Sequence, residues 1–265
     1  MGKLLHHDLT YQLRGLLYAT HNALRPGWPE EAYHQALVER IRKLEIPVQS
    51  KPKCTLVHQN VPIHTFECDL LVWEKLILEL KVLPFSSFAP VHFAQLISYL
   101  KSWNKDLGLL VNFGPTRLNI ERVAWTNPLF ETHRDFSRFV TQSNLIPDSF
   151  QEIELIVNTV ASQIGLGYLG KIYHKILSVE FSARGDSCLS NVEIPIPLDN
   201  RIQPHLAADY LLFENAHLIQ VNGLLIAPTS YHFAQMKTFL RALDLQSGII
   251  VNFGKKQLQI FGVPA

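Results

Sequence analysis

The chain has 265 residues, of which 47% are hydrophobic and 18% charged, and its formal net charge is +1. This is the composition of an ordinary globular protein with room for two modest domains or one large one. The near-zero charge excludes a strong overall attraction to nucleic acid, although a local basic patch stays possible. No segment reaches the roughly 18 apolar residues of a membrane span, and the N-terminus lacks the apolar core of a signal peptide.

Cysteine usage gives an expectation about the compartment. The three cysteines, Cys54, Cys68 and Cys188, are odd in number and widely separated, with no C-x-x-C pair. This pattern argues against a disulfide framework and against a zinc site. We therefore expect buried thiols in the reducing cytoplasm and no membrane contact.

Two helices are predicted at the start of the chain. Leucines at helical spacing indicate a helix over residues 8–24. Pro26 and Gly27 end it, because proline cannot donate to the helix ladder and glycine tolerates unusual dihedral angles. A second helix is expected over about 30–44, since Pro29 stands at a helix start, where proline is best tolerated.

Strands and a third helix follow. Segments rich in Val, Ile, Leu and Phe predict three strands. They cover residues 52–58, 62–72 and 76–83. A helix is then expected over about 90–103, followed by strands over 107–113 and 118–124. The order helix, helix, three strands, helix, two strands predicts a mixed sheet with helices on its faces.

Two tetrapeptides occur twice at one spacing of 140 residues. The sequence HFAQ at 92–95 returns at 232–235, and VNFG at 111–114 returns at 251–254. Two identical tetrapeptides at one offset are very unlikely by chance, so the chain is predicted to be a tandem duplication. The same offset relates three single residues to their copies: Gly27, Tyr33 and Asp69 to Gly167, Tyr173 and Asp209.

The duplication predicts the domain organisation. We expect one unit over residues 1–125, a second over 150–265, and a connecting segment over 126–149. The connecting segment is polar and contains Pro128 and Pro147. Three phenylalanines in it nevertheless predict a helix packed on the body: Phe130, Phe136 and Phe139.

A cluster of charged residues is predicted on the hairpin that ends in Glu79-Leu80-Lys81. If this hairpin turns at Glu74, Asp69 lies directly opposite Glu79. Strand alternation places Glu79 and Lys81 on one face. Two carboxylates among apolar residues repel each other, and a hard cation such as Mg²⁺ relieves that cost. The alternative is an exposed sheet face on which Lys81 merely offsets Glu79.

Two further motifs flank this cluster. Residues 27–33 fit G-x-x-E-x-x-Y with Glu30 at the acidic position, and residues 95–99 fit Q-x-x-x-Y. Taken together, residues 8–124 resemble the GxxExxY family of the PD-(D/E)XK nuclease superfamily. The resemblance covers nearly all of the first unit, with the motifs in the right order.

The resemblance implies an α/β fold of two tandem restriction-endonuclease-like units, each a mixed central sheet flanked by helices. It implies a nuclease that uses Mg²⁺ or Mn²⁺ and acts on DNA, or alternatively on RNA. Asp69, Glu79 and the carbonyl of Leu80 would ligate the metal, and Glu30 would supply another carboxylate. Lys81 would orient or deprotonate the attacking water.

The remaining motif residues have a supporting role or an ordinary structural one. By the resemblance, Gln95 would contact the phosphate or steady the site, and Tyr99 would support it. Tyr33 and Tyr99 could equally be core residues, and Glu30 an ordinary first-turn acid favoured by the helix dipole. His92 could touch a phosphate or simply be a surface histidine at a helix start.

The second unit keeps the framework but changes the charged positions. Gln220 stands for Glu79, Asn222 for Lys81 and Gly170 for Glu30. Asp209 and Gln235 are retained, and Phe239 replaces Tyr99. We expect an inactive copy kept for structure or binding, which would make the chain an internal pseudo-dimer with a single active site. Two alternatives stay open: a non-catalytic nucleic-acid-binding or scaffold protein of nuclease descent, and an assembly partner in a DNA repair or defence system.

Overall fold

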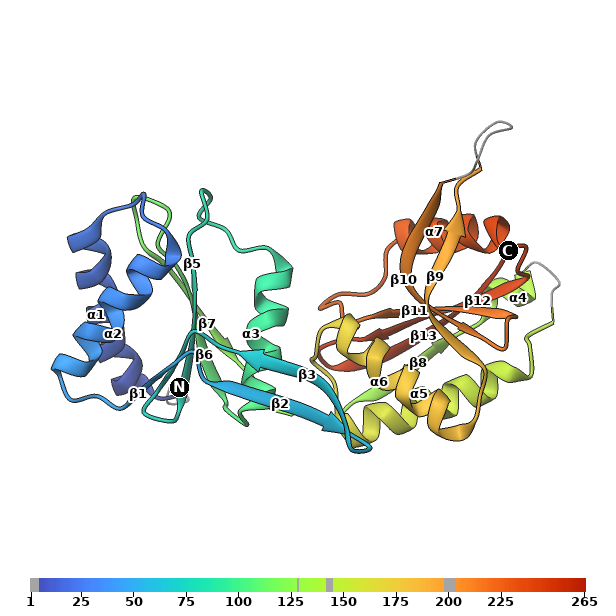
Figure 1. Ribbon diagram of the computed structural model, residues 1–265, viewed down its shortest axis with the longest axis horizontal. Helices are drawn as coiled ribbons and strands as arrows, with labels where there is room; N and C mark the ends of the chain where they lie inside the picture. Colours follow the sequence, from blue (N-terminus) through green and yellow to red (C-terminus); the bar gives the residue numbers. More distant parts are fainter. Residues whose placement is uncertain (1–4, 128, 142–144, 198–203) are drawn as a thin grey trace. The chain divides into compact units, whose positions relative to one another are not determined.

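The computed structural model describes residues 5–127, 129–141, 145–197 and 204–265. The chain divides into two compact units (Figure 1). Unit 1 comprises residues Met1–Leu56 and His64–Thr126, and unit 2 comprises Val57–Ile63 and Asn127–Ala265. None of the described helices is both long enough and apolar enough to cross a membrane.

Unit 1 is a five-stranded mixed sheet with helices on both faces. The strand order is β1-β4-β5-β6-β7, in which β5 and β6 are parallel and the other neighbours antiparallel. The strands are β1 (Val48–Ser50), β4 (Leu70–Val72), β5 (Leu76–Lys81), β6 (Leu107–Asn112) and β7 (Asn119–Ala124). Helices α1 (His7–Leu24) and α2 (Glu30–Lys43) lie on one face and α3 (Pro90–Ser102) on the other (Figure 1). The predicted fold class is confirmed.

The predicted strand over 62–72 is wrong in one respect, because it is broken at Asp69. β3 (Val61–Glu67) pairs with β2 (Lys53–His58) in a separate two-stranded sheet, and β4 begins only at Leu70. At the break, the carbonyl of Asp69 accepts a hydrogen bond from the Lys51 amide at 2.9 Å. The chain therefore changes sheets at the residue that was predicted to carry chemistry.

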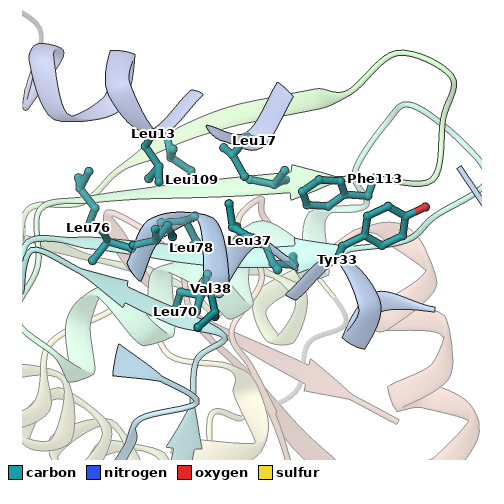
Figure 2. Close-up of a cluster of buried hydrophobic side chains, with 14 of the residues drawn as sticks. Leu13, Leu17, Tyr33, Leu37, Val38, Leu70, Leu76, Leu78, Leu109 and Phe113 are labelled. Carbon is teal, nitrogen blue, oxygen red and sulfur yellow. The ribbon is translucent and has the colours of Figure 1, made fainter. Parts of the chain in front are cut away.

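The core of unit 1 lies between the α1–α2 layer and the sheet (Figure 2). Leu13 and Leu17 of α1 and Leu37 of α2 pack on alternate strand residues such as Leu78 and Leu109, all of them fully buried. Each such side chain contributes about 1.5–3 kcal/mol through burial. Because Leu78 and Leu80 face this core, strand alternation directs Glu79 and Lys81 to the other face.

Unit 2 repeats this architecture with one extra strand. Helices α5 and α6 lie on one face of its sheet and α7 on the other (Figure 1). The strand order is β8-β13-β12-β11-β10-β9. The helices are α5 (Ser149–Ile164), α6 (Gly170–Arg184) and α7 (Ser230–Ala242). The strands after the first are β9 (Cys188–Pro195), β10 (His205–Phe213), β11 (His217–Asn222), β12 (Ser247–Phe253) and β13 (Gln257–Pro264).

The extra strand comes from the segment predicted as a connecting helix. Residues 131–135 form β8 (Glu131–Asp135), which pairs in parallel with β13, and the helix among the described residues of this segment is the short α4 (Ser137–Thr141). Phe136 and Phe139 are buried and pack edge-on against Phe150. These two phenylalanines thus do pack on the body, whereas Phe130 is only half-buried. The residues before Phe136 form a strand because they pair with the edge of β13. Pro128 lies outside the described residues.

Candidate active site at the end of β5

The β4–β5 hairpin has the predicted register. Leu70 pairs with Leu78 and Val72 with Leu76, so extending the ladder by one pair places Asp69 opposite Glu79. Asp69 lies just before the first residue of β4, and its side chain, in place of its backbone, bonds to the backbone of β5. Its Oδ2 accepts a hydrogen bond from the Leu80 amide at 2.7 Å, which fixes the carboxylate beside β5.

The buried Glu79 is bonded to the partly buried Lys81 next to Asp69. Lys81 Nζ donates to Glu79 Oε1 at 2.5 Å, and the Glu79 side chain is only 3% exposed. Burial, with repulsion from Asp69, raises the pKa of Glu79 to about 8. Burial alone would lower the pKa of Lys81, but attraction to Glu79 and its hydrogen bond raise it above the ordinary value. Lys81 therefore stays an ammonium ion.

Glu30 lies close enough to this group for its charge to interact with those of Lys81 and Asp69. It is the first residue of α2, where backbone amides favour a negative charge. Burial raises the pKa of Glu30; Lys81 opposes that rise and Asp69 adds to it. These mutual charge effects place Glu30, Asp69 and Lys81 in one electrostatic cluster.

Tyr33 holds the loop that leads to Glu30. Its hydroxyl donates to the carbonyl of Arg25 at 2.6 Å, and its ring stacks on Phe113. The loop turns at Gly27, whose φ of 118° is one that residues with a side chain rarely adopt. Tyr33 is thus a buried residue that sets where α2 begins, and so where Glu30 stands.

The α3 residues divide into a pair near the cluster and a helix cap. Gln95 Nε2 donates to the Tyr99 hydroxyl at 2.7 Å. Burial first, and then the charge of Glu79, raise the pKa of Tyr99, which places this pair beside the carboxylates. His92 Nδ1 instead accepts a hydrogen bond from the Ala89 amide at 3.2 Å. His232 caps α7 in the same way, so this contact is part of the shared framework.

The side chains of this cluster fit a hard divalent cation. Three carboxyl groups lie near a single ammonium ion, and oxygen is the donor that Mg²⁺ prefers. The described residues include no group of three or more His, Cys, Asp or Glu side chains that could hold a metal ion by themselves. A metal would therefore be held by one or two of the carboxylates together with water, as is usual for Mg²⁺.

The corresponding end of β11 in unit 2 has a shifted hairpin. Gln220 of β11 pairs with Ile250 of β12, and Glu79 of β5 pairs with Leu110 of β6. The two pairs occupy the same place in the parallel registers of the two units, so Gln220 is the structural counterpart of Glu79. The residue that pairs with Gln220 across the hairpin is Tyr210. Asp209, which the 140-residue offset matches to Asp69, lies one residue away, at an irregularity in β10. Its side chain is 63% exposed.

The space used by Glu30 in unit 1 is closed in unit 2. A Cβ atom on Gly170, the counterpart of Glu30, would lie 2.9 Å from the carbonyl oxygen of Val221 and 3.0 Å from the amide of Gly223. The first turn of α6 therefore rests directly on the backbone at the end of β11. Above it, Gln220 Oε1 and Asn222 Nδ2 are buried without a hydrogen-bond partner among the described residues.

Sequence reasoning missed three residues that surround Asp69. His34 Nε2 lies 3.2 Å from the Asp69 carbonyl oxygen, and the Lys51 amide donates to the same oxygen. Cys68 is fully buried, and its burial beside Glu79 and Asp69 raises the pKa of the thiol to about 12. Only His34 carried a signal, because it follows the motif tyrosine directly and returns at the fixed offset as His174.

The comparisons with known proteins agree with the duplication. A family model described as PD-(D/E)XK nuclease superfamily matches the chain twice, over residues 7–123 and 147–261. A search of curated proteins finds no match. A solved structure described as "Crystal structure of SSO0001" is 12% identical and covers 46% of this chain and 78% of its own, with a TM-score of 0.28. That similarity is too low to carry a structural argument.

Proposed function

The chain belongs to the PD-(D/E)XK nuclease superfamily, and from this premise we propose that unit 1 hydrolyses phosphodiester bonds of DNA at a single active site. The observation that carries the proposal is the cluster of the buried Glu79 with the partly buried Asp69 and Lys81 at the end of β5. RNA is the alternative substrate. Within the superfamily, the motif Gly27-x-x-Glu30-x-x-Tyr33 supports assignment to the GxxExxY family.

The proposed domain organisation follows the duplication. Residues 1–125 form the nuclease-like domain with the intact site, 126–149 connect the two copies and add β8 and α4 to the second, and 150–265 form the degenerate copy. The closed space at Gly170 and the neutral Gln220 support the view that the second copy is inactive.

Each residue of the cluster has a proposed role. Asp69 and Glu79, with the Leu80 carbonyl, would hold Mg²⁺ or Mn²⁺, and Glu30 would bind the water shell of the metal. When bound, the metal supplies Lewis-acid polarisation of the phosphate and activation of water. The ammonium of Lys81 would orient the attacking water and offset negative charge that develops on the phosphate. Gln95, held by Tyr99, would steady the phosphate.

The test is cleavage of a supercoiled plasmid with Mg²⁺ or Mn²⁺. We expect nicked circles to appear first, because one site cuts one strand per encounter. Asp69→Asn should abolish cleavage, whereas the matched control Asp209→Asn, at an exposed position outside the corresponding site, should leave it unchanged. Equal losses in both variants would contradict the assignment of the site to unit 1.

Inactivity with every divalent metal would favour the second candidate, a non-catalytic nucleic-acid-binding protein of nuclease descent. The observation in its favour is the 2.5 Å contact that ties Lys81 to Glu79. In that case Asp69→Asn would alter neither cleavage nor DNA binding, and the binding assay below would still report the affinity.

A further inference from the structure

A groove on the outer side of α1 has a chemistry that the active-site cluster does not explain. Its volume is about 660 Å³, and α1 supplies its lining together with Arg122 of β7. On α1 the lining includes Tyr11, Arg14, Gly15 and Tyr18, whose spacing of three, one and three residues places them on one helical stripe. None of the eight described residues that line the groove is acidic.

The two arginines make the groove an anion site. Burial and then repulsion from Arg14 lower the pKa of Arg122, which shows that the two positive charges lie close together. Arg122 is anchored by donating to the Thr10 hydroxyl and to the Leu5 carbonyl, each at 2.6 Å. Arg14 has no ion-pair partner among the described residues, so its charge is available to a ligand.

The two tyrosines and the glycine between them shape the groove for flat rings. Tyr11 is 76% exposed and Tyr18 is 41% exposed. Gly15 lies between them on the helix, and a Cβ there would meet nothing within 4 Å. Packing therefore does not require this glycine, which costs about 0.5–1 kcal/mol relative to alanine within a helix. Its effect is to leave an open floor between two exposed aromatic rings.

Unit 2 shows what occupies the counterpart of this groove. There the 140-residue offset replaces Arg14 by Glu154 and Tyr18 by Asn158. β8 lies over that face: Arg134 forms an ion pair with Glu154 at 3.1 Å, and Thr132 donates to Asn158. The counterpart thus holds an extended segment that presents a cation. In unit 1 the lining charge is reversed, so the matching occupant is extended and anionic.

We propose that the groove of Tyr11, Arg14, Gly15, Tyr18 and Arg122 binds a single-stranded nucleic acid, with its phosphates at the arginines and its bases on the tyrosines. An acidic peptide would satisfy the arginines but would leave the exposed rings and the open floor unused. A nucleic-acid strand uses all of them, because stacking platforms beside basic side chains are how proteins hold single strands.

The proposal rests on the proposed nuclease function and names the form of its substrate. β7 lies two strands from β5, about 10 Å across the sheet. Because α1 covers the face of the sheet opposite to the one that Glu79 and Lys81 occupy, a strand that reaches both sites passes around the end of the sheet. The groove would hold the part of the strand that flanks the cleaved bond.

The test is binding of a fluorescent 12-nucleotide oligothymidylate in metal-free buffer, measured by anisotropy. Arg14→Glu, which introduces the acid found in unit 2, should weaken binding at least tenfold and lower the salt dependence of binding. Tyr11→Ala and Tyr18→Ala should each weaken it by about 5- to 100-fold. The matched control Lys43→Glu, the same change of charge on the exposed surface of α2, should weaken it less than threefold.

Two outcomes would contradict the proposal that this groove binds a single strand. One is an equal loss of affinity in Arg14→Glu and Lys43→Glu, which would indicate diffuse charge attraction. The other is a glutamate dodecapeptide that competes as well as the oligonucleotide, which would assign the groove to a protein strand. Gly15→Leu should fill the floor without disturbing the fold, and it therefore tests the shape when a tyrosine variant proves unstable.

A small substrate separates this proposal from the proposed function. Hydrolysis of bis(p-nitrophenyl) phosphate with Mn²⁺ requires only the active site. Arg14→Glu should lose strand binding and keep hydrolysis of this ester, which is too small to reach the groove, whereas Lys81→Ala should lose the hydrolysis. A wild-type protein that binds the strand but never hydrolyses the ester would refute the nuclease and leave the groove intact.

Discussion

The ends of β5 in unit 1 and of β11 in unit 2 share a framework but differ in chemistry. Both strands lie between an antiparallel hairpin partner and a parallel neighbour, and Glu79 and Gln220 occupy equivalent places in the parallel register. Around Glu79 the structure gathers carboxylates and an ammonium ion. Around Gln220 it gathers amides and the hydroxyl of Tyr210, which donates to Gln235 at 3.2 Å.

The difference shows that the second site was remodelled as well as neutralised. Its hairpin turn has the same length, but β10 gains one residue at the irregularity near Asp209, so Tyr210 stands where Asp69 stands in unit 1. The backbone at Gly223 has also closed onto Gly170. Charge loss alone could be reversed by substitution, but a displaced strand and a filled space cannot. The framework of this fold is therefore stable without the buried charges of unit 1.

Copying the residues of unit 2 into unit 1 should give the largest effect. The double substitution Glu79→Gln and Lys81→Asn removes a carboxylate and the ammonium ion that the proposed chemistry uses. We expect plasmid cleavage to fall at least about 1,000-fold, since loss of single electrostatic stabilisers already costs enzymes 10²–10³. Unit 2 folds with the same two amides, so the far-ultraviolet circular dichroism should not change.

The reverse substitution sharpens the comparison. Gln220→Glu with Asn222→Lys, placed in the inactive double variant, should restore no cleavage, because Asp209 lies outside the pocket and the space at Gly170 is closed. Recovery of cleavage would show that unit 2 differs from an active site only by its missing charged side chains. It would contradict the conclusion that the backbone of this site has also changed.

A second large effect is expected on the stability of the metal-free protein as a function of pH. The pKa of Glu79 is about 8 in the folded state, against an ordinary value of about 4.3. The folded state therefore holds a proton that the unfolded state releases, and stability falls as pH rises from about 4.5 through 8. The loss amounts to at most about 4–5 kcal/mol.

Urea unfolding between pH 5 and 8 measures this slope. Glu79→Gln should flatten it, because a neutral amide does not titrate, and Gln220 shows that the fold accommodates glutamine at this place. The exposed control Glu74→Gln should keep the wild-type slope. An unchanged slope in Glu79→Gln would mean that another group is responsible.

Much of this comparison could be predicted from the sequence. The repeated tetrapeptides revealed the duplication, and counting from the turn gave the register of β4 and β5. The repeats also mark the shared framework: His92 and His232 cap helices, and Asn112 and Asn252 accept hydrogen bonds from the amides of Leu83 and Leu224. Short-range spacing and local hydrogen bonds are the features that can be predicted directly from a sequence.

The parts that could not be predicted depend on long-range pairing. Unit 2 gains one residue in β10 before the paired part of the hairpin, and the following loop loses one before His232, so the constant offset conceals the shift. The strand β8 forms because it pairs with the edge of β13, and no local sequence pattern predicts such long-range pairing. The contact of Gly170 with the end of β11 likewise joins segments about 50 residues apart.

The smallest predicted effect tests this closure directly. Alanine in place of a helical glycine normally stabilises a protein by up to about 1 kcal/mol. Gly170→Ala should do the opposite and destabilise unit 2 by about 1–3 kcal/mol, because its Cβ would meet backbone atoms at 2.9–3.1 Å. The matched variant is Gly15→Ala, whose Cβ would meet nothing within 4 Å, so it should show the normal gain.

Urea unfolding of the two variants side by side measures the contrast between an occupied and an open space. A gain in both would mean that the backbone at Val221 and Gly223 moves aside at little cost. The second site could then reopen, and its inactivity would rest on Gln220 and Asn222 alone. Opposite signs would show that packing of α6 on β11 now stabilises unit 2 in the space where unit 1 keeps a carboxylate.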